Sequence, residues 1–179
     1  MIQKSSIWKT AEVFFSNPTK WHYLKNISKR INLAHTSVKQ NLDKLINLGV
    51  IKENIEKKGK RIFPIYCANV HEYVFKKYKL IYNITSLIES DLAIFIEKKL
   101  SPKSVIVFGS YRRGEDTEDS DIDIFIECEK EEIDVAEFEK KLGRNIQLHF
   151  NKNLGSYPKE LKNNIINGIV LSGFVEAYK

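Results

Sequence analysis

The sequence predicts an α/β (α+β) protein of two small domains, the first mostly helical and the second built on a short mixed sheet flanked by helices. Three observations predict this. The 179 residues suffice for two domains of roughly 70 to 100 residues each. Helical periodicity dominates the first half, whereas the second half alternates apolar strands with helices. The net charge also differs in sign between the two ends of the chain. Residues 1–70 hold 13 Lys and Arg against 4 Asp and Glu, whereas residues 101–179 hold 11 against 15.

The composition excludes several classes of protein. Hydrophobic residues make up 42% and charged residues 29% of the chain, and Gly and Pro are few, as in an ordered globular protein. No run approaches the roughly 18 apolar residues of a membrane span, and residues 1–10 lack the apolar core of a secretory signal. We therefore expect a cytoplasmic protein without a membrane partner, in which Cys67 and Cys128 are reduced thiols rather than a disulfide.

Residues 7–67 predict three helices followed by a β-hairpin. The first helix covers residues 7–15 and stops before Asn17-Pro18, and the second covers residues 23–31. The third begins at Thr36 or Ser37, whose side chain would act as N-cap, and ends at Gly49. Two strand-like segments then enclose a basic turn.

This order of elements resembles the winged helix-turn-helix fold, which we expect over residues 1–69. The resemblance implies that the third helix enters the major groove of double-stranded DNA and that the hairpin, or wing, lies along its backbone. The expected DNA contacts are Thr36, Ser37, Gln40, Lys44 and Asn47 on the helix and Lys57, Lys58, Lys60 and Arg61 on the wing. An ordinary solvated helix face, or a winged domain used for protein contacts, is the alternative.

Residues 70–100 predict a helical connector in two stretches that break between residues 85 and 90. Its exposed apolar positions would pack on the second domain or pair two subunits in a homodimer. The sequence does not separate these two options.

The chemistry-bearing motif lies in the second domain, residues 101–179. A buried strand, residues 104–108, is followed at once by Gly109-Ser110, and ten residues later comes a strand that opens with Asp121-Ile-Asp123. Side chains two apart in a strand share a face, so both carboxylates would lie side by side while Ile122 points into the core. Paired carboxylates suit Mg²⁺, and a glycine allows a phosphate to approach the backbone.

This stretch resembles the signature of the polymerase-beta nucleotidyltransferase superfamily, especially its minimal nucleotidyltransferase branch, over about residues 90–174 and with a helical segment at residues 160–178. The resemblance implies that Gly109 and Ser110 hold the triphosphate of an NTP. Asp121 and Asp123 would be the catalytic ligands of Mg²⁺ or Mn²⁺. Arg113 would contact phosphates or brace the acidic loop that follows it.

One feature departs from that family. Its third carboxylate comes from a later strand, here residues 145–150, where the alternation places Gln147 beside the aspartates. An amide adds no charge for a second metal and does not deprotonate a nucleophile. His149 is either a general base or a structural histidine.

Two functions agree with these features. The first is an enzyme that binds Mg-NTP and transfers a nucleoside monophosphate to a hydroxyl of a protein, nucleic acid or small molecule. The second is a winged-helix transcriptional regulator whose degenerate domain senses nucleotide or a partner without turnover. Minimal relatives often act as antitoxins, so the resemblance also implies a small helical toxin as a candidate partner.

Overall fold

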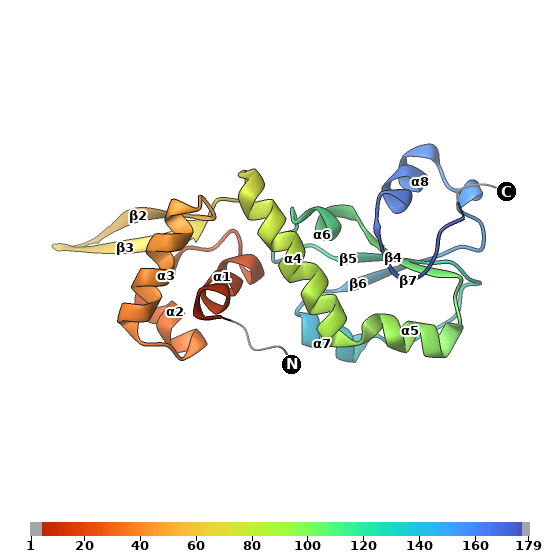
Figure 1. The fold of residues 1–179 in the computed structure, drawn as a ribbon, viewed down its shortest axis with the longest axis horizontal. Coiled ribbons are helices and arrows are strands. Elements are labelled where there is room, and N and C mark those ends of the chain that lie inside the picture. The colour runs from red at the N-terminus through yellow and green to blue at the C-terminus, as the bar shows by residue number, and fades with distance from the viewer. Residues whose placement is uncertain (1–4, 177–179) are drawn as a thin grey trace. The chain divides into compact units, whose positions relative to one another are not determined.

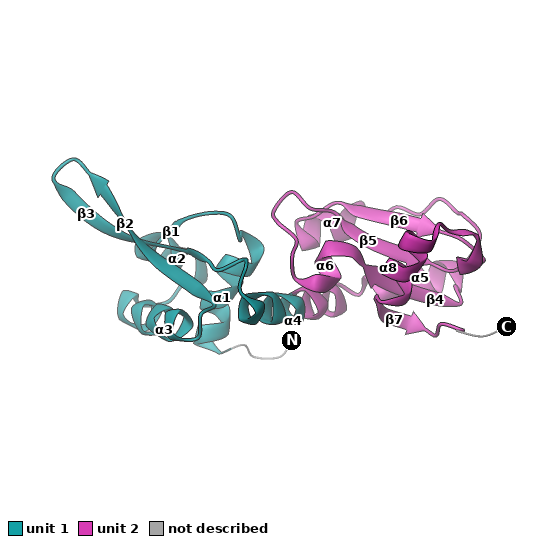
Figure 2. Ribbon diagram, turned by 90° about the horizontal axis from the view of Figure 1, so that it is seen from above, with its two compact units in different colours: residues 1–82 teal, residues 83–179 magenta. Residues whose placement is uncertain are grey.

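The computed structural model describes residues 5–176 and has a mixed α/β fold (Figure 1). It divides into two compact units at the junction of Tyr82 and Asn83 (Figure 2). Helix α4, Tyr73–Ser90, contributes its first ten residues to unit 1 and the remainder to unit 2. Over the described residues, no helix is both long enough and apolar enough to span a membrane.

Unit 1 contains the three helices and the hairpin that the sequence predicts. Its described elements are α1 Ser6–Ser16, β1 His22–Tyr23, α2 Leu24–Ile31, α3 His35–Asn47, β2 Ile51–Lys58 and β3 Arg61–Ala68. The strands form an antiparallel sheet in the order β1-β3-β2, in which the two-residue β1 is an addition to the prediction. The predicted N-cap of the third helix is wrong, because α3 begins at His35 after Ala34, without a side-chain cap. Thr36 and Ser37 lie inside its first turn.

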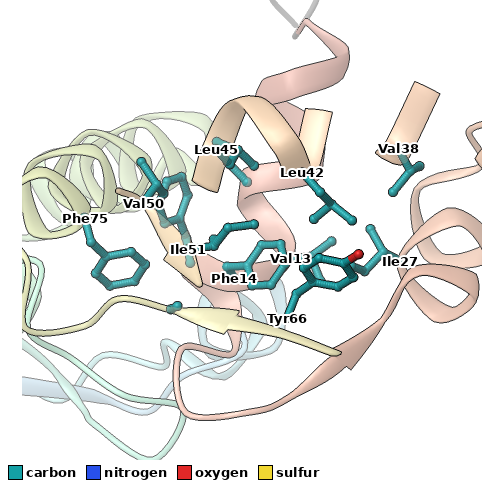
Figure 3. Close-up of a cluster of buried hydrophobic side chains, with 13 residues drawn as sticks. Val13, Phe14, Ile27, Val38, Leu42, Leu45, Val50, Ile51, Tyr66 and Phe75 are labelled. Atoms are coloured by element: carbon teal, nitrogen blue, oxygen red, sulfur yellow. The ribbon is translucent and has the colours of Figure 1, made fainter. Parts of the chain in front are cut away.

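The core of unit 1 lies between α1, α3 and the base of the hairpin (Figure 3). Phe14 of α1 and Leu42 of α3 are fully buried against Tyr66 of β3. Val38 and Leu45 complete the buried stripe of α3, as its helical spacing predicts. The opposite side of α3 is therefore left to solvent.

Unit 2 is built on a four-stranded mixed sheet in the order β6-β5-β4-β7. Its described strands are β4 Ser104–Phe108, β5 Ile122–Ile126, β6 Ile146–Phe150 and β7 Ile169–Gly173. The helices are α5 Leu92–Leu100, α6 Gly109–Arg113, α7 Ala136–Leu142 and α8 Lys159–Ile166, with a 3₁₀ turn at Leu154–Ser156. Strands β5 and β6 are parallel, whereas β4 runs antiparallel to both of its neighbours.

Helices cover both faces of this sheet, which explains why its central strands β4 and β5 are apolar apart from Ser104 and Asp123. One face presents Ile122 and Ile124 to a cluster that includes Leu92 of α5. The other face presents Phe125 to Ile165 of α8. With both faces covered, β4 is buried at every position.

One prediction of secondary structure is wrong. The expected helical segment at residues 160–178 is not one helix, because α8 ends at Ile166 and the chain continues as β7, paired with β4. Gly168 permits this change, since a Cβ there would lie 2.5 Å from Cγ2 of Ile106 and 2.7 Å from the carbonyl oxygen of Val107. The last two residues of the expected segment lie outside the described residues. The connector has the two helical stretches that the sequence predicts, α4 and α5, and its break lies at Asp91 with φ 66°, one residue beyond the predicted range.

Both cysteines are free thiols, as predicted. Burial raises the pKa of Cys67, which lies in β3. The pKa of Cys128 is raised by burial and, to a lesser degree, by the nearby carboxylates of Glu131 and Glu129. Both thiols therefore favour the protonated, less reactive form.

Leu42→Ala should lower the free energy of unfolding by about 2–5 kcal/mol, because it leaves a cavity at a fully buried position of α3. Gln40→Ala, on the exposed side of the same helix, should change it by less than about 0.5 kcal/mol. Urea denaturation followed by circular dichroism measures both values. Equal effects of the two substitutions would contradict the assigned face of α3.

Candidate active site

The two aspartates of the Asp-x-Asp motif lie at the beginning of β5. Asp121 is exposed immediately before the strand, and Asp123 lies within it, opposite Phe108 of β4. The side chain of Asp123 is 25% exposed. Ile122 and Ile124 are completely buried, as the alternation predicts. The strand thus fixes the Asp123 carboxylate at the surface through the burial of its neighbours.

Gly109 lies directly against the Asp123 carboxylate. It follows β4 with φ +73°, a conformation that glycine adopts without strain. A Cβ at this position would lie only 2.4 Å from Oδ2 of Asp123. Glycine is therefore required twice, by the backbone conformation and by the contact. Ser110 follows in the first turn of α6, half-buried.

Strand β6 adds an amide and an imidazole to the same face of the sheet. Gln147 is the partner of Asp123 in the parallel register and is exposed. His149, two residues further on, places Nε2 3.2 Å from Oδ1 of Asp123. Its ring meets the Phe108 ring edge-to-face, with the centroids 5.1 Å apart. The residue paired with Asp123 on β6 is therefore the uncharged amide Gln147, as the sequence predicts.

A buried carboxylate holds the loop that joins α6 to β5. Asp116 is 2% exposed, and its Oδ1 accepts a 2.7 Å hydrogen bond from Nδ2 of Asn83. The same amide donates to the carbonyl oxygen of Tyr111 at 2.8 Å. A guanidinium nitrogen of Arg144 lies 3.9 Å from Oδ2 of Asp116. This cluster fixes the segment between Ser110 and Asp121.

Sequence reasoning missed this cluster for a physical reason. Asp116 stands among acidic residues that are typical of a solvated loop, and Asn83 lies inside a helical pattern. No spacing rule brings these two residues and Arg144 together. Only the folded chain shows that one of the loop carboxylates turns inward.

Arg113 has a partner within its own loop. Its Nε donates to Oε2 of Glu115 at 2.7 Å, and the backbone N–H of Glu115 donates to the carbonyl oxygen of Ser110 at 3.0 Å. In this structure Arg113 is thus paired with the first residue of the acidic loop. The Arg113 side chain remains 46% exposed.

A polar cavity of about 630 Å³ lies beside Asp121. Ser120, Glu139, Lys140 and Arg144 are among its lining residues, so acids and bases share its wall. Its volume is within the range of small-molecule sites.

The predicted DNA contacts occupy two places in unit 1. All of them are exposed except Ser37, which is half-buried. The exposed ones on α3 are Thr36, Gln40, Lys44 and Asn47, and those on the hairpin are Lys57, Lys58, Lys60 and Arg61. Lys58 is already engaged, since its Nζ lies 3.2 Å from a Glu56 oxygen and 2.6 Å from the hydroxyl of Tyr23.

Comparison with known proteins identifies the family of unit 2. The sequence profile of the family described as "Nucleotidyltransferase domain" matches residues 89–171, from the end of α4 into β7. A Methanocaldococcus jannaschii protein named "Putative protein adenylyltransferase MJ1379" is 39% identical over 67 residues, which cover 33% of this chain and 67% of that protein. The chain belongs to the nucleotidyltransferase domain family. No solved structure matches it significantly.

Nucleotidyltransferase domains generally use divalent metal ions, and the donors present here fit one. Asp121 and Asp123 provide hard carboxylate oxygens, and the Asp123 carboxylate is held at the glycine turn. Mg²⁺ takes its remaining ligands from water and phosphates, so two protein carboxylates suffice. Across residues 5–176 no three His, Cys, Asp or Glu side chains form a preformed metal cluster.

Gly109→Ala should weaken binding of Mg-ATP by at least about tenfold, since the new methyl group displaces the Asp123 carboxylate. Gly143→Ala is the matched control, because Gly143 also has a positive φ (65°) but no atom within 4 Å of the place that a methyl group would occupy. Isothermal titration calorimetry measures both affinities. Equal loss in the two variants would show that backbone strain, not the contact with Asp123, is responsible.

Asn83→Leu should destabilise the protein by about 3 kcal/mol, because it removes the amide that donates a hydrogen bond to the buried Asp116 carboxylate. Asn164→Leu, at an exposed position of α8, should change the stability by less than about 0.5 kcal/mol. Thermal and urea unfolding measure the difference. An Asn83→Leu protein as stable as the wild type would show that Asp116 does not depend on this amide.

Proposed function

We propose that unit 2 binds Mg-NTP and transfers its nucleoside monophosphate to a hydroxyl of a protein, a nucleic acid or a small molecule. The observation that carries this proposal is the close apposition of Gly109 and Asp123, with Asp121 two residues before. This apposition places a glycine turn, which allows a phosphate to approach the backbone, beside a pair of carboxylates that suits magnesium. The family and the similarity to a protein named as an adenylyltransferase support it.

The transfer replaces one phosphoester linkage by another. The acceptor oxygen forms a bond to the α-phosphorus, and the bond from this phosphorus to the oxygen bridging to the β-phosphate breaks. Pyrophosphate leaves, and the proton of the acceptor hydroxyl passes to solvent. Catalysis of such a step depends on positioning and on stabilisation of negative charge.

The residues of this chain have distinct roles in the proposal. Gly109 and Ser110 hold the triphosphate, and Asp121 and Asp123 are the ligands of Mg²⁺ or Mn²⁺. Arg113 contacts the phosphates or braces the acidic loop through Glu115. Magnesium, when bound there, supplies positive charge that offsets charge developing on the phosphates. The polar cavity beside Asp121 is the candidate entry for the acceptor.

A second candidate function is nucleotide or partner sensing without turnover. The observation that favours it is the exposed amide of Gln147 in register with Asp123, where a third carboxylate would complete the site. In this version the protein is a transcriptional regulator, antitoxin-like in its organisation, and a helical toxin is the candidate partner.

Unit 1 would bind double-stranded DNA in both versions, as a winged helix-turn-helix. Support comes from the exposed polar row of α3, from the basic hairpin and from the excess of nine positive charges over residues 1–70. The location that we propose is the cytoplasm, where NTP is available.

Incubation with α-labelled NTPs, Mg²⁺ or Mn²⁺ and candidate acceptors tests the enzyme. We expect label on an acceptor, and its loss in an Asp121→Asn/Asp123→Asn double variant, which removes both anionic ligands. Nucleotide binding by calorimetry without any transfer would select the sensor. Absence of both binding and transfer would contradict the two proposals together.

Gln147→Glu should tighten Mg²⁺ or Mn²⁺ binding by roughly tenfold or more, since it adds an anion beside Asp123 in the sheet register. Asn164→Asp adds the same charge on α8 and controls for the change in net charge. Titration with Mn²⁺, followed by electron paramagnetic resonance, measures the affinity. An equal affinity in the two variants would show that residue 147 does not reach the metal.

A further inference from the structure

The polar cavity beside Asp121 lies where two parallel strands begin. Strands β5 and β6 run in the same direction, so the segments that lead into them meet at one edge of the sheet. The backbone N–H of Ile122 donates a hydrogen bond to the carbonyl oxygen of Asn145 at 2.9 Å, which joins these two segments. Residues 118–121 supply one part of the lining of the cavity, and residues between 136 and 145 supply the rest.

The two parts of the lining differ in charge. The segment before β5 contributes three carboxylates, those of Glu118, Asp119 and Asp121. The segment before β6 contributes the cations Lys140 and Arg144. It also contributes Glu139, but Oε1 of this side chain accepts a 2.8 Å hydrogen bond from the backbone N–H of Ile146. The cavity therefore has an acidic side and a basic side.

Charges on both sides are available to a ligand. Over residues 5–176, the structure gives the side chains of Asp119, Asp121 and Lys140 no ion pair or hydrogen bond, and all three residues are exposed. Arg144 is held more tightly, because its side chain is 11% exposed and a guanidinium nitrogen lies 3.9 Å from Oδ2 of the buried Asp116. We therefore expect Asp119 and Lys140 to select the ligand, one from each side.

Asp121 connects this cavity with the proposed nucleotide site. It is a proposed ligand of the metal and it lines the cavity, whereas Gly109 and Ser110, which are proposed to hold the triphosphate, do not line it. A molecule in the cavity would thus lie against a metal ligand without taking the place of the triphosphate. An acceptor needs such a position, since its hydroxyl must be held close to the reacting phosphate.

The lining distinguishes between classes of acceptor. Among the described residues that line the cavity, none is aromatic and Ala136 alone has an apolar side chain, so a nucleobase or a phenol ring finds no surface to stack on. The carboxylates would also repel the phosphates of a nucleic-acid strand. The volume of about 630 Å³ is more than one free amino acid fills. A polypeptide segment with charged side chains of both signs fits these conditions.

We propose that the cavity binds the acceptor as a polypeptide segment in which a Ser or Thr lies between a basic and an acidic residue. The basic side chain contacts Asp119, the acidic side chain contacts Lys140, and the hydroxyl lies beside Asp121. This proposal rests on the nucleotidyl transfer proposed for unit 2. The hydroxyl oxygen forms a bond to the α-phosphorus, the bond from this phosphorus to the bridging oxygen breaks, pyrophosphate leaves, and the hydroxyl proton passes to solvent.

The test compares peptides that differ only around a central Ser, incubated with the full chain, α-labelled NTPs and Mg²⁺ or Mn²⁺. Peptides with Lys on one side of the Ser and Glu on the other, in both orders, should include one that is labelled roughly fivefold or more faster than a peptide with Gln at both places. Two exposed ion pairs provide an effect of this size. The same peptide with Tyr in place of Ser, and free serine, should be labelled less than the Ser peptide.

Charge reversal locates the contacts. Asp119→Lys should transfer the preference to a peptide with Glu on both sides of the Ser, and Lys140→Glu should transfer it to a peptide with Lys on both sides. Glu132→Lys and Lys98→Glu make the same changes at exposed positions that do not line the cavity, so these matched controls should retain the preference of the wild type.

The outcomes separate this proposal from the transfer on which it rests. Labelling that is indifferent to the charges of the peptide, or that is faster with Tyr or free serine, would overturn the acceptor proposal and leave nucleotidyl transfer intact. Charge-selective peptide binding, measured by fluorescence anisotropy, without label on any acceptor would overturn the transfer and leave a peptide-binding cavity. Absence of both binding and label would overturn the two proposals together.

Discussion

The contact between Gly109 and the Asp123 carboxylate is the constraint around which unit 2 is organised. It requires β4 and β5 to be adjacent and antiparallel, so that the residue leaving one strand meets the second residue of the other. It also requires a residue without Cβ, held at a positive φ. Burial of Ile122 and Ile124 keeps β5 from shifting by one residue, which would turn Asp123 to the opposite face. The position of the carboxylate is therefore set by the core rather than by its own hydrogen bonds.

Gln147 gives this site an unusual electrostatic balance. The parallel register brings an amide to Asp123 where a carboxylate would increase the attraction for divalent ions. The imidazole of His149 is in contact with the same aspartate. With fewer fixed anions, the site has less repulsion toward the phosphates of a nucleotide, and less charge with which to hold a second metal ion. The first effect favours nucleotide binding and the second disfavours turnover, so such a site can bind a nucleotide without turning it over.

The parts of the fold that periodicity controls could be predicted from the sequence, including the three helices of unit 1, the hairpin and the strands β4 to β6. The strand β7 could not, because Ile169–Gly173 is a short apolar run that suits a helix or a strand equally, and its pairing with β4 is decided by the close approach at Gly168. At the site, the Asp-x-Asp alternation was sufficient to place Ile122 and Ile124 in the core. The inward turn of Asp116 was not predictable, because it depends on Asn83, which lies 33 residues away in the chain.

Helix α4 has a consequence for how such proteins can be assembled from parts. Lys79, fully buried, donates a hydrogen bond to the carbonyl oxygen of Phe15 in unit 1, and Asn83, one turn later, donates to Asp116 in unit 2. The one helix thus supplies a buried polar side chain to each unit. Exchange of the first unit for another by recombination must accordingly keep Lys79 with unit 1 and Asn83 with unit 2, since each side chain completes the hydrogen bonding of its own unit.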